Sequence, residues 1–175
     1  MRKRIWTSIF LILFLALIGG LFHNALKPES LSPGGVLPEI VFRSEVGFSE
    51  RLRVDSTRMT LVVYFHSDCE PCLSQLQLFN ETPSVLENTR IFLLTDEKDF
   101  FAHKRMYTWP NLMNASNFTW GIAEAEQLVE GLGARVTPSI YIFDGNGTLL
   151  KKIVGEIKLD GLLSELRKYD NPNAI

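Results

Sequence analysis

Cysteine is scarce in this chain: its 175 residues include only Cys69 and Cys72. Two cysteines cannot cross-link a small secreted scaffold through several bridges, so any disulfide is local and concerns chemistry more than stability. Glycine and proline are also few, at 12 and 8 residues, which argues against a collagen-like chain, and the 46% of hydrophobic residues argues against a disordered one. A chain of this length is expected to form one domain.

The chain also lacks an excess of positive charge, with a formal net charge of -2. The first 24 residues hold three cations, Arg2, Lys3 and Arg4, and no acid, so the remaining residues carry 15 basic and 20 acidic side chains, a net charge of -5. Nucleic-acid-binding domains need a basic surface. We therefore expect no nucleic-acid partner.

The N-terminus predicts where the protein resides. Residues 1–4 are basic, and residues 5–22 form an apolar stretch whose length is near the lower limit for crossing a hydrocarbon core of roughly 30 Å. This order predicts a cytoplasmic tail at residues 1–4, a single transmembrane signal-anchor at residues 5–22 and an exported body. A cleaved signal peptide has the same order of charge and apolar run, but no small-x-small cleavage pattern follows Phe22.

The rest of the chain is predicted to hold one α/β domain. Residues 23–36, rich in Pro, Gly and Ser, form a linker, the domain covers residues 37–170, and residues 171–175 form a C-terminal tail. Extended segments are expected at residues 37–43, 52–54, 61–65, 90–94, 139–143 and 148–154, and helices at residues 69–82, 98–107, 122–132 and 159–169. This order predicts a mixed central sheet flanked by helices.

The two cysteines stand at the start of the first of these helices, as Cys69-Glu70-Pro71-Cys72. Ser67 or Asp68 is expected to be the N-cap residue, and Pro71 is tolerated in the first turn. Free N–H groups and the positive end of the helix dipole stabilise a thiolate at the first cysteine and lower its pKa. The second cysteine lies deeper in the helix and can resolve a mixed disulfide.

Two other interpretations of the cysteine pair are a zinc half-site and two buried apolar side chains. Zinc usually takes four ligands, and the chain has no second cysteine pair. His66 and His103 could complete a set of ligands, but we expect no metal site.

Three segments together resemble the thioredoxin-like superfamily, specifically its exported, membrane-tethered TlpA/ResA-like thiol-disulfide oxidoreductases. They are the apolar run 61–65 leading into the cysteine pair, the sequence Val136-Thr137-Pro138-Ser139 about 65 residues later, and the strand that ends in Asp144-Gly145-Asn146-Gly147. The resemblance covers residues 37–169. It implies a thioredoxin-like fold and a protein thiol-disulfide oxidoreductase.

The resemblance also implies roles for individual residues. Cys69 would be the attacking nucleophile and Cys72 the resolving thiol, and the two would form a disulfide with each other. The bond between Thr137 and Pro138 would be cis and face the cysteine pair, so that an extended substrate segment pairs with the backbone there. No cofactor is expected. Electrons would pass to or from a second dithiol protein in the membrane, and the tasks of the family include reducing exported proteins such as apocytochrome c.

The chain departs from the family pattern at three places. Asp68 stands where many thioredoxins have Trp, the strand before the cysteines lacks an acid, and Gln75 stands where ResA-type relatives often have Glu. Water, or an acid from elsewhere such as Asp96 or Glu97, would then have to accept the proton of Cys72.

The charges around Cys69 indicate the direction of electron flow. Asp68 and Glu70 flank it and disfavour its thiolate, so together with Pro71 they tune the potential. Strong oxidants stabilise their reduced thiolate, whereas reductants do not. We therefore expect a reductase.

Two alternatives stay open at this point. One is a copper-binding chaperone that uses the two cysteines and His66, and the other is a non-catalytic binding module on the same fold. The segment 109–120, long for a connection, could line a partner surface near the cysteines or pack Trp109 and Trp120 into the core.

Overall fold

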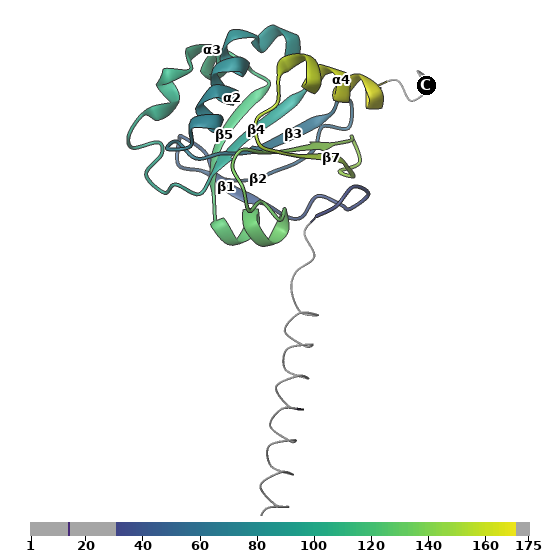
Figure 1. Ribbon diagram of the computed structural model, residues 1–175. Helices are drawn as coiled ribbons and strands as arrows, with labels where there is room; N and C mark the ends of the chain where they lie inside the picture. Colours follow the sequence, from purple (N-terminus) through teal and green to yellow (C-terminus); the bar gives the residue numbers. More distant parts are fainter. Residues whose placement is uncertain (1–13, 15–30, 171–175) are drawn as a thin grey trace, which may run out of the picture.

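A seven-stranded mixed sheet forms the centre of the computed structural model, which describes residue 14 and residues 31–170 (Figure 1). The strands are β1 (Val41–Arg43), β2 (Ser49–Arg51), β3 (Thr60–Tyr64), β4 (Arg90–Thr95), β5 (Phe118–Ala123), β6 (Ser139–Phe143) and β7 (Leu149–Val154). The α-helices are α2 (Glu70–Glu81), α3 (Pro110–Asn114) and α4 (Leu159–Asp170), and shorter helical turns are η1 (Pro83–Leu86), η2 (Arg105–Thr108) and η3 (Gln127–Gly131).

Strand β3 lies inside the sheet, whose order is β2-β1-β5-β4-β3-β6-β7. It pairs parallel with β4 and antiparallel with β6, and β4 pairs parallel with β5. The hairpin β6–β7 and the entry hairpin β1–β2 are antiparallel. The predicted α/β class with a mixed sheet is therefore confirmed.

Each face of the sheet carries its own hydrophobic core. Leu61 and Val63 of β3 pack with α2 and α4 on one face, whereas Val62 and Tyr64 pack on the other face with residues around η3. Figure 1 shows α2, α3 and α4 together on one side of the sheet. A strand covered on both faces is expected to be apolar without alternation, as residues 61–65 are.

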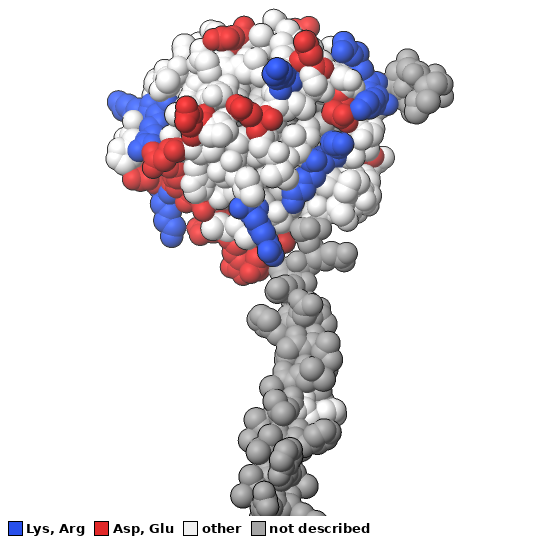
Figure 2. Space-filling model, in the orientation of Figure 1, with Lys and Arg blue, Asp and Glu red and all other residues white. Residues whose placement is uncertain are grey.

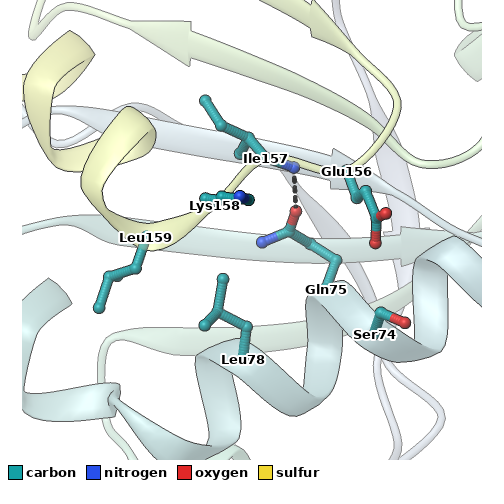
Figure 3. A pocket seen from close by; sticks show the side chains of 7 residues that line it. All are labelled: Ser74, Gln75, Leu78, Glu156, Ile157, Lys158 and Leu159. Atoms are coloured by element: carbon teal, nitrogen blue, oxygen red, sulfur yellow. Dashed lines mark hydrogen bonds between the residues drawn. The ribbon is translucent and has the colours of Figure 1, made fainter.

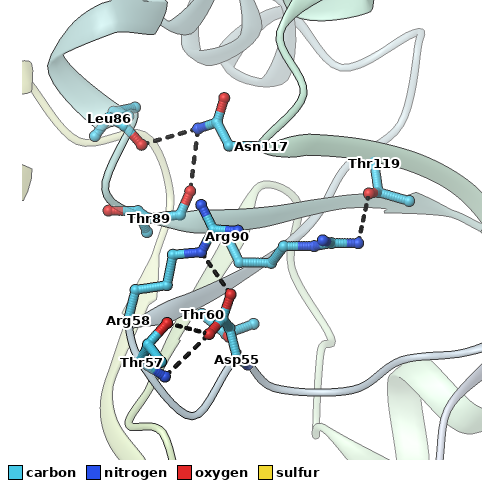
Figure 4. Close-up of polar contacts among 9 residues, drawn as sticks. All are labelled: Asp55, Thr57, Arg58, Thr60, Leu86, Thr89, Arg90, Asn117 and Thr119. Atoms are coloured by element: carbon cyan, nitrogen blue, oxygen red, sulfur yellow. Dashed lines mark hydrogen bonds and ion pairs between the residues drawn. The ribbon is translucent and has the colours of Figure 1, made fainter.

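Polar contacts fix the loops that lead into β3, β4 and β5 (Figure 4). The Asp55 carboxylate accepts hydrogen bonds from the backbone and hydroxyl of Thr57 and from Nε of Arg58, and these bonds lower the pKa of Asp55. The amide of Asn117, just before β5, donates to the carbonyls of Leu86 and Thr89. These contacts lie at the start of the strands, at the opposite end of β3 from the cysteines.

The helix predicted at residues 98–107 is wrong. Turns occupy most of this segment, Lys104 has a left-handed φ of 52°, and only the short η2 follows. Phe100 is buried against Phe65 and Trp120, at ring-centroid distances of 5.3 and 5.7 Å. Packing of Phe100 against the core, and not helix formation, therefore determines the path of this segment.

The helix predicted at residues 122–132 is also wrong in its first part, because Ile122 and Ala123 belong to β5. This strand pairs with β4 and β1, and the sequence prediction missed it. Trp109 and Trp120 stack in the core with their ring centroids 5.9 Å apart. Of the two interpretations of segment 109–120, core packing of both tryptophans is thus confirmed.

Backbone hydrogen bonds join the end of the predicted linker to the start of β7. The amide of Gly34 donates to the Leu149 carbonyl, and the amide of Leu149 donates to the Gly35 carbonyl, at 2.8 and 2.7 Å. In residue 14 and residues 31–170, no helix is long and apolar enough to cross a membrane. Apart from Phe14, the anchor predicted at residues 5–22 lies outside the described residues, as do the tails at residues 1–4 and 171–175.

Charges of both signs are interspersed over the face of the domain seen in Figure 2, with wide uncharged areas between them. No single-sign field covers that face.

Candidate active site

Cys69 and Cys72 lie where β3 passes into α2. Cys69 is the N-cap residue of the helix, and its Sγ accepts a hydrogen bond from the Cys72 amide at 3.3 Å. The predicted N-cap residues, Ser67 and Asp68, are wrong, because their side chains are bound elsewhere: Ser67 to Glu97 and Asp68 to Arg105. The sulfur atom itself therefore receives the free N–H group of the first turn.

The two sulfur atoms form a disulfide, with Sγ atoms 2.23 Å apart and Cα atoms 5.2 Å apart. They differ in exposure: Cys72 is fully buried in the core under α2, whereas Cys69 is partly exposed. An incoming thiolate can therefore reach the disulfide only at Cys69.

The loop before β6 faces this disulfide. The Thr137–Pro138 peptide bond is cis, and the carbonyl oxygen of Thr137 lies 3.4 Å from Sγ of Cys69. The carbonyl of Pro138 accepts a hydrogen bond from the Gly155 amide at 2.8 Å, and the Ser139 hydroxyl donates to the Val136 carbonyl at 2.5 Å. The implied cis bond opposite the cysteines is confirmed, and Thr137 keeps partial exposure beside them.

Arg105 compensates the charge of Asp68, a contact that the sequence did not reveal. Its Nη1 lies 3.0 Å from Oδ1 of Asp68 and also contacts Oγ of Ser67. The hydrogen bond to Asp68 raises the pKa of Arg105. Glu70 and Pro71 are exposed, and Glu70 has no ion pair within residues 31–170.

Glu97 holds the loop that precedes Cys69. Its carboxylate accepts hydrogen bonds from the backbone amide and hydroxyl of Ser67, at 2.9 and 2.5 Å, and from the Thr95 hydroxyl at 3.2 Å. The Glu97 carboxylate thus accepts hydrogen bonds from Ser67 and Thr95, and within residues 31–170 no hydrogen bond joins it to Cys72.

Asp96 is bound on the opposite face of the sheet from α2. Its Oδ1 lies 2.6 Å from Nε2 of His66 and 3.3 Å from the Tyr64 hydroxyl. Burial, with the charge of Asp96, raises the pKa of Tyr64. The acids considered for the Cys72 proton, Asp96 and Glu97, are therefore both held by other groups.

Gln75 follows Cys72 by one helical turn and is buried, with 2% of its surface exposed. Its Oε1 accepts a hydrogen bond from the Ile157 amide at 2.7 Å, and its Nε2 makes no hydrogen bond in the described part of the chain. A carboxamide does not exchange a proton near neutral pH, so this position holds a hydrogen-bonding group and not a base.

His66, the third ligand of the copper hypothesis, is bound by its ring to Asp96 and to the Tyr64 hydroxyl. Over residue 14 and residues 31–170, no three side chains among His, Cys, Asp and Glu are grouped so that they could hold a metal ion.

We expect the substitution Arg105→Met to make the reduced Cys69 thiol less reactive. Without the guanidinium, the Asp68 carboxylate next to Cys69 is uncompensated and raises the pKa of the thiol. Alkylation of the reduced protein by iodoacetamide at pH 7 should slow about threefold, as expected for one surface charge removed at this range. The control is Lys98→Met, which removes an exposed cation with no ion pair in the described chain. An unchanged or faster rate in Arg105→Met would contradict the compensation.

No protein-family model matches this chain, and no curated protein matches it. Solved structures do match. A thiol:disulfide interchange protein from Bacteroides sp. is 19% identical, with a TM-score of 0.63 over 83% of this chain and 95% of the other. A peroxiredoxin-like protein from Aquifex aeolicus is 15% identical, with a TM-score of 0.63 over 81% and 90% of the two chains.

A thioredoxin-like protein from Porphyromonas gingivalis is 16% identical, with a TM-score of 0.60 over 79% of this chain and 94% of the other. At these identities the likeness concerns the fold. Together with the sheet order and the position of the cysteine pair, it shows that this chain has the thioredoxin-like fold.

Proposed function

We propose that the protein is a TlpA/ResA-like thiol-disulfide oxidoreductase that exchanges disulfides with protein substrates. The observation that carries this proposal is the unequal exposure of a disulfide at a helix N-terminus, with Cys72 buried and Cys69 open beside Thr137. The structural neighbour from Bacteroides sp. is a thiol:disulfide interchange protein, which agrees with this activity.

In the proposed reaction the reduced protein acts first through Cys69. Its thiolate attacks one sulfur of a substrate disulfide, a mixed disulfide forms, and the other substrate sulfur leaves as a thiolate that takes up a proton. Cys72 then loses its proton and attacks Sγ of Cys69, which releases the second substrate thiolate. The substrate gains two electrons, and the Cys69–Cys72 disulfide is formed.

Different groups of the site act in the attack by Cys69, in substrate binding and in the deprotonation of Cys72. The Cys72 amide and the N-terminal end of α2 stabilise negative charge on Sγ of Cys69. The exposed part of Thr137 lies within reach of a substrate chain at Cys69. The Cys72 proton goes to water or to the leaving thiolate, since the carboxylates of Glu97 and Asp96 are held by other groups and the Gln75 carboxamide is not a base.

The proposal extends to the location and the partners of the protein. The basic residues 1–4 and the apolar residues 5–22 support a single-pass anchor with the domain on the exported side of the membrane. A second dithiol protein in that membrane would then reduce the Cys69–Cys72 disulfide again. No cofactor is needed in this cycle.

We expect the substitution Cys72→Ser to trap substrates. The variant can attack through Cys69 but cannot resolve the mixed disulfide, so a covalent adduct should accumulate. Electrophoresis without reductant, followed by mass spectrometry of the shifted bands, would show the adducts and identify the substrates.

The matched control is Cys69→Ser, in which the remaining cysteine of the pair is the buried Cys72. It should form no adduct, or at most a small fraction of that seen with Cys72→Ser. Equal adducts in both variants, or none in either, would contradict the proposed attack through Cys69.

We expect the Cys69–Cys72 disulfide of the purified protein to have a reduction potential below about -150 mV, which is more reducing than that of strong oxidants, near -120 mV. Glu70 has no ion pair in the described chain and lies next to Cys69, so the thiolate is less stable than in strong oxidants. Equilibration of the protein with glutathione buffers, read by alkylation and mass, gives the value. A potential above about -150 mV would overturn the reductase direction while leaving disulfide exchange intact.

A further inference from the structure

A cavity of about 450 Å³ lies between α2 and the segment that joins β7 to α4 (Figure 3). Its walls come from two short stretches of chain: Ser74, Gln75 and Leu78 on α2, and Glu156, Ile157, Lys158 and Leu159. The cavity is close to the disulfide along both stretches. Gln75 is one turn beyond Cys72, and Gly155, just before Glu156, is hydrogen-bonded to the carbonyl of Pro138.

An unused donor points into this cavity. Gln75 is 98% buried, and its Nε2 has no hydrogen-bond partner in the described chain, whereas its Oε1 is held by the Ile157 amide. In Figure 3 the Gln75 nitrogen points toward the space between Leu78 and Leu159. A buried N–H group without an acceptor is unfavourable, so the position is suited to an oxygen atom supplied from outside the domain.

The surroundings of this nitrogen favour an anionic oxygen. Helix α4 is 12 residues long and begins at Leu159, so the positive end of its dipole lies at the cavity wall. Lys158 adds a cation at the same wall, and it has no ion pair within residues 31–170. Glu156 is the one acid of the lining, and Figure 3 shows its carboxylate on the other side of the Gln75 side chain.

We propose that this cavity is a substrate subsite that takes an acidic side chain, Asp or Glu, close to the cysteine that Cys69 attacks. The carboxylate accepts a hydrogen bond from Nε2 of Gln75 and faces Lys158. The side chains of Leu78, Ile157 and Leu159 pack against its methylene groups. This inference rests on the proposed function, because the acid reaches the cavity as part of a chain bound across Thr137 and Pro138.

The test measures how fast the reduced full-length protein reduces defined peptide disulfides. Each peptide carries one cysteine as a mixed disulfide with 2-mercaptoethanol, and the products are two free thiols and the oxidised protein. Each peptide of one set carries one Glu, placed at one of the three positions before or the three positions after the cysteine. Each peptide of the matched set carries Gln at the same position. We expect Glu at one or two of these positions to increase the second-order rate constant about tenfold.

Variants assign this selectivity to the cavity. Lys158→Met should reduce the ratio of the Glu to the Gln rate constant, and Gln75→Glu should bring it below one. Gln75→Glu keeps the oxygen that accepts from the Ile157 amide but replaces the donor by a second carboxylate. The control Lys168→Met removes an α4 cation that is bound to Glu165, and it should leave the ratio unchanged.

The outcomes separate the two proposals. Equal rates for Glu and Gln at every position, with exchange proceeding, would overturn the subsite and leave the oxidoreductase intact. A Glu preference that persists unchanged in both Lys158→Met and Gln75→Glu would place the selectivity outside this cavity and also overturn it. Absence of exchange with every peptide would contradict the proposed function and the subsite with it.

Discussion

The hydrogen bond from the Cys72 amide to Sγ of Cys69 is the contact on which the site depends. It exists because β3 ends next to the first turn of α2, where backbone N–H groups lack helical partners. A sulfur atom in the N-cap position receives this donor and the positive end of the helix dipole at once. Both effects favour a thiolate at Cys69 in the reduced protein.

The position of that contact is fixed by the two cores. All five residues of β3 are buried, the strand lies between the parallel β4 and the antiparallel β6, and α2 packs through Leu76 and Phe79 on one face. The same packing covers Cys72 completely and leaves Cys69 at the surface. The asymmetry of the cysteine pair is thus a result of how the helix is buried.

The polar groups around the cysteines form a closed set of contacts. Arg105 pairs with Asp68, Glu97 holds Ser67, and Asp96 binds His66 on the other face. Gln75 is the buried exception, because one end of its amide has no partner in the described residues, whereas Glu70 is unpaired but exposed to solvent. Gln75 also lines the neighbouring cavity, so the free end of its amide is available to a group bound there.

Much of this arrangement could be predicted from the sequence. The apolar run at β3, the helix after the cysteines and the β6–β7 hairpin have strong local signals, and the Thr-Pro pair was identified by resemblance. The segment 98–107 and strand β5 could not be predicted, because Phe100, Trp109 and Trp120 are placed by packing with residues distant in sequence. Arg105 was missed for the same reason, since 37 residues separate it from Asp68.

The difference between the two cysteines can be measured directly. In the reduced full-length protein, limited alkylation with iodoacetamide at pH 7, followed by peptide mass spectrometry, gives separate rates for the two thiols. We expect Cys69 to be alkylated at least about tenfold faster than Cys72, because Cys72 is buried and the helix end stabilises the Cys69 thiolate. Equal rates, or faster alkylation of Cys72, would contradict this account.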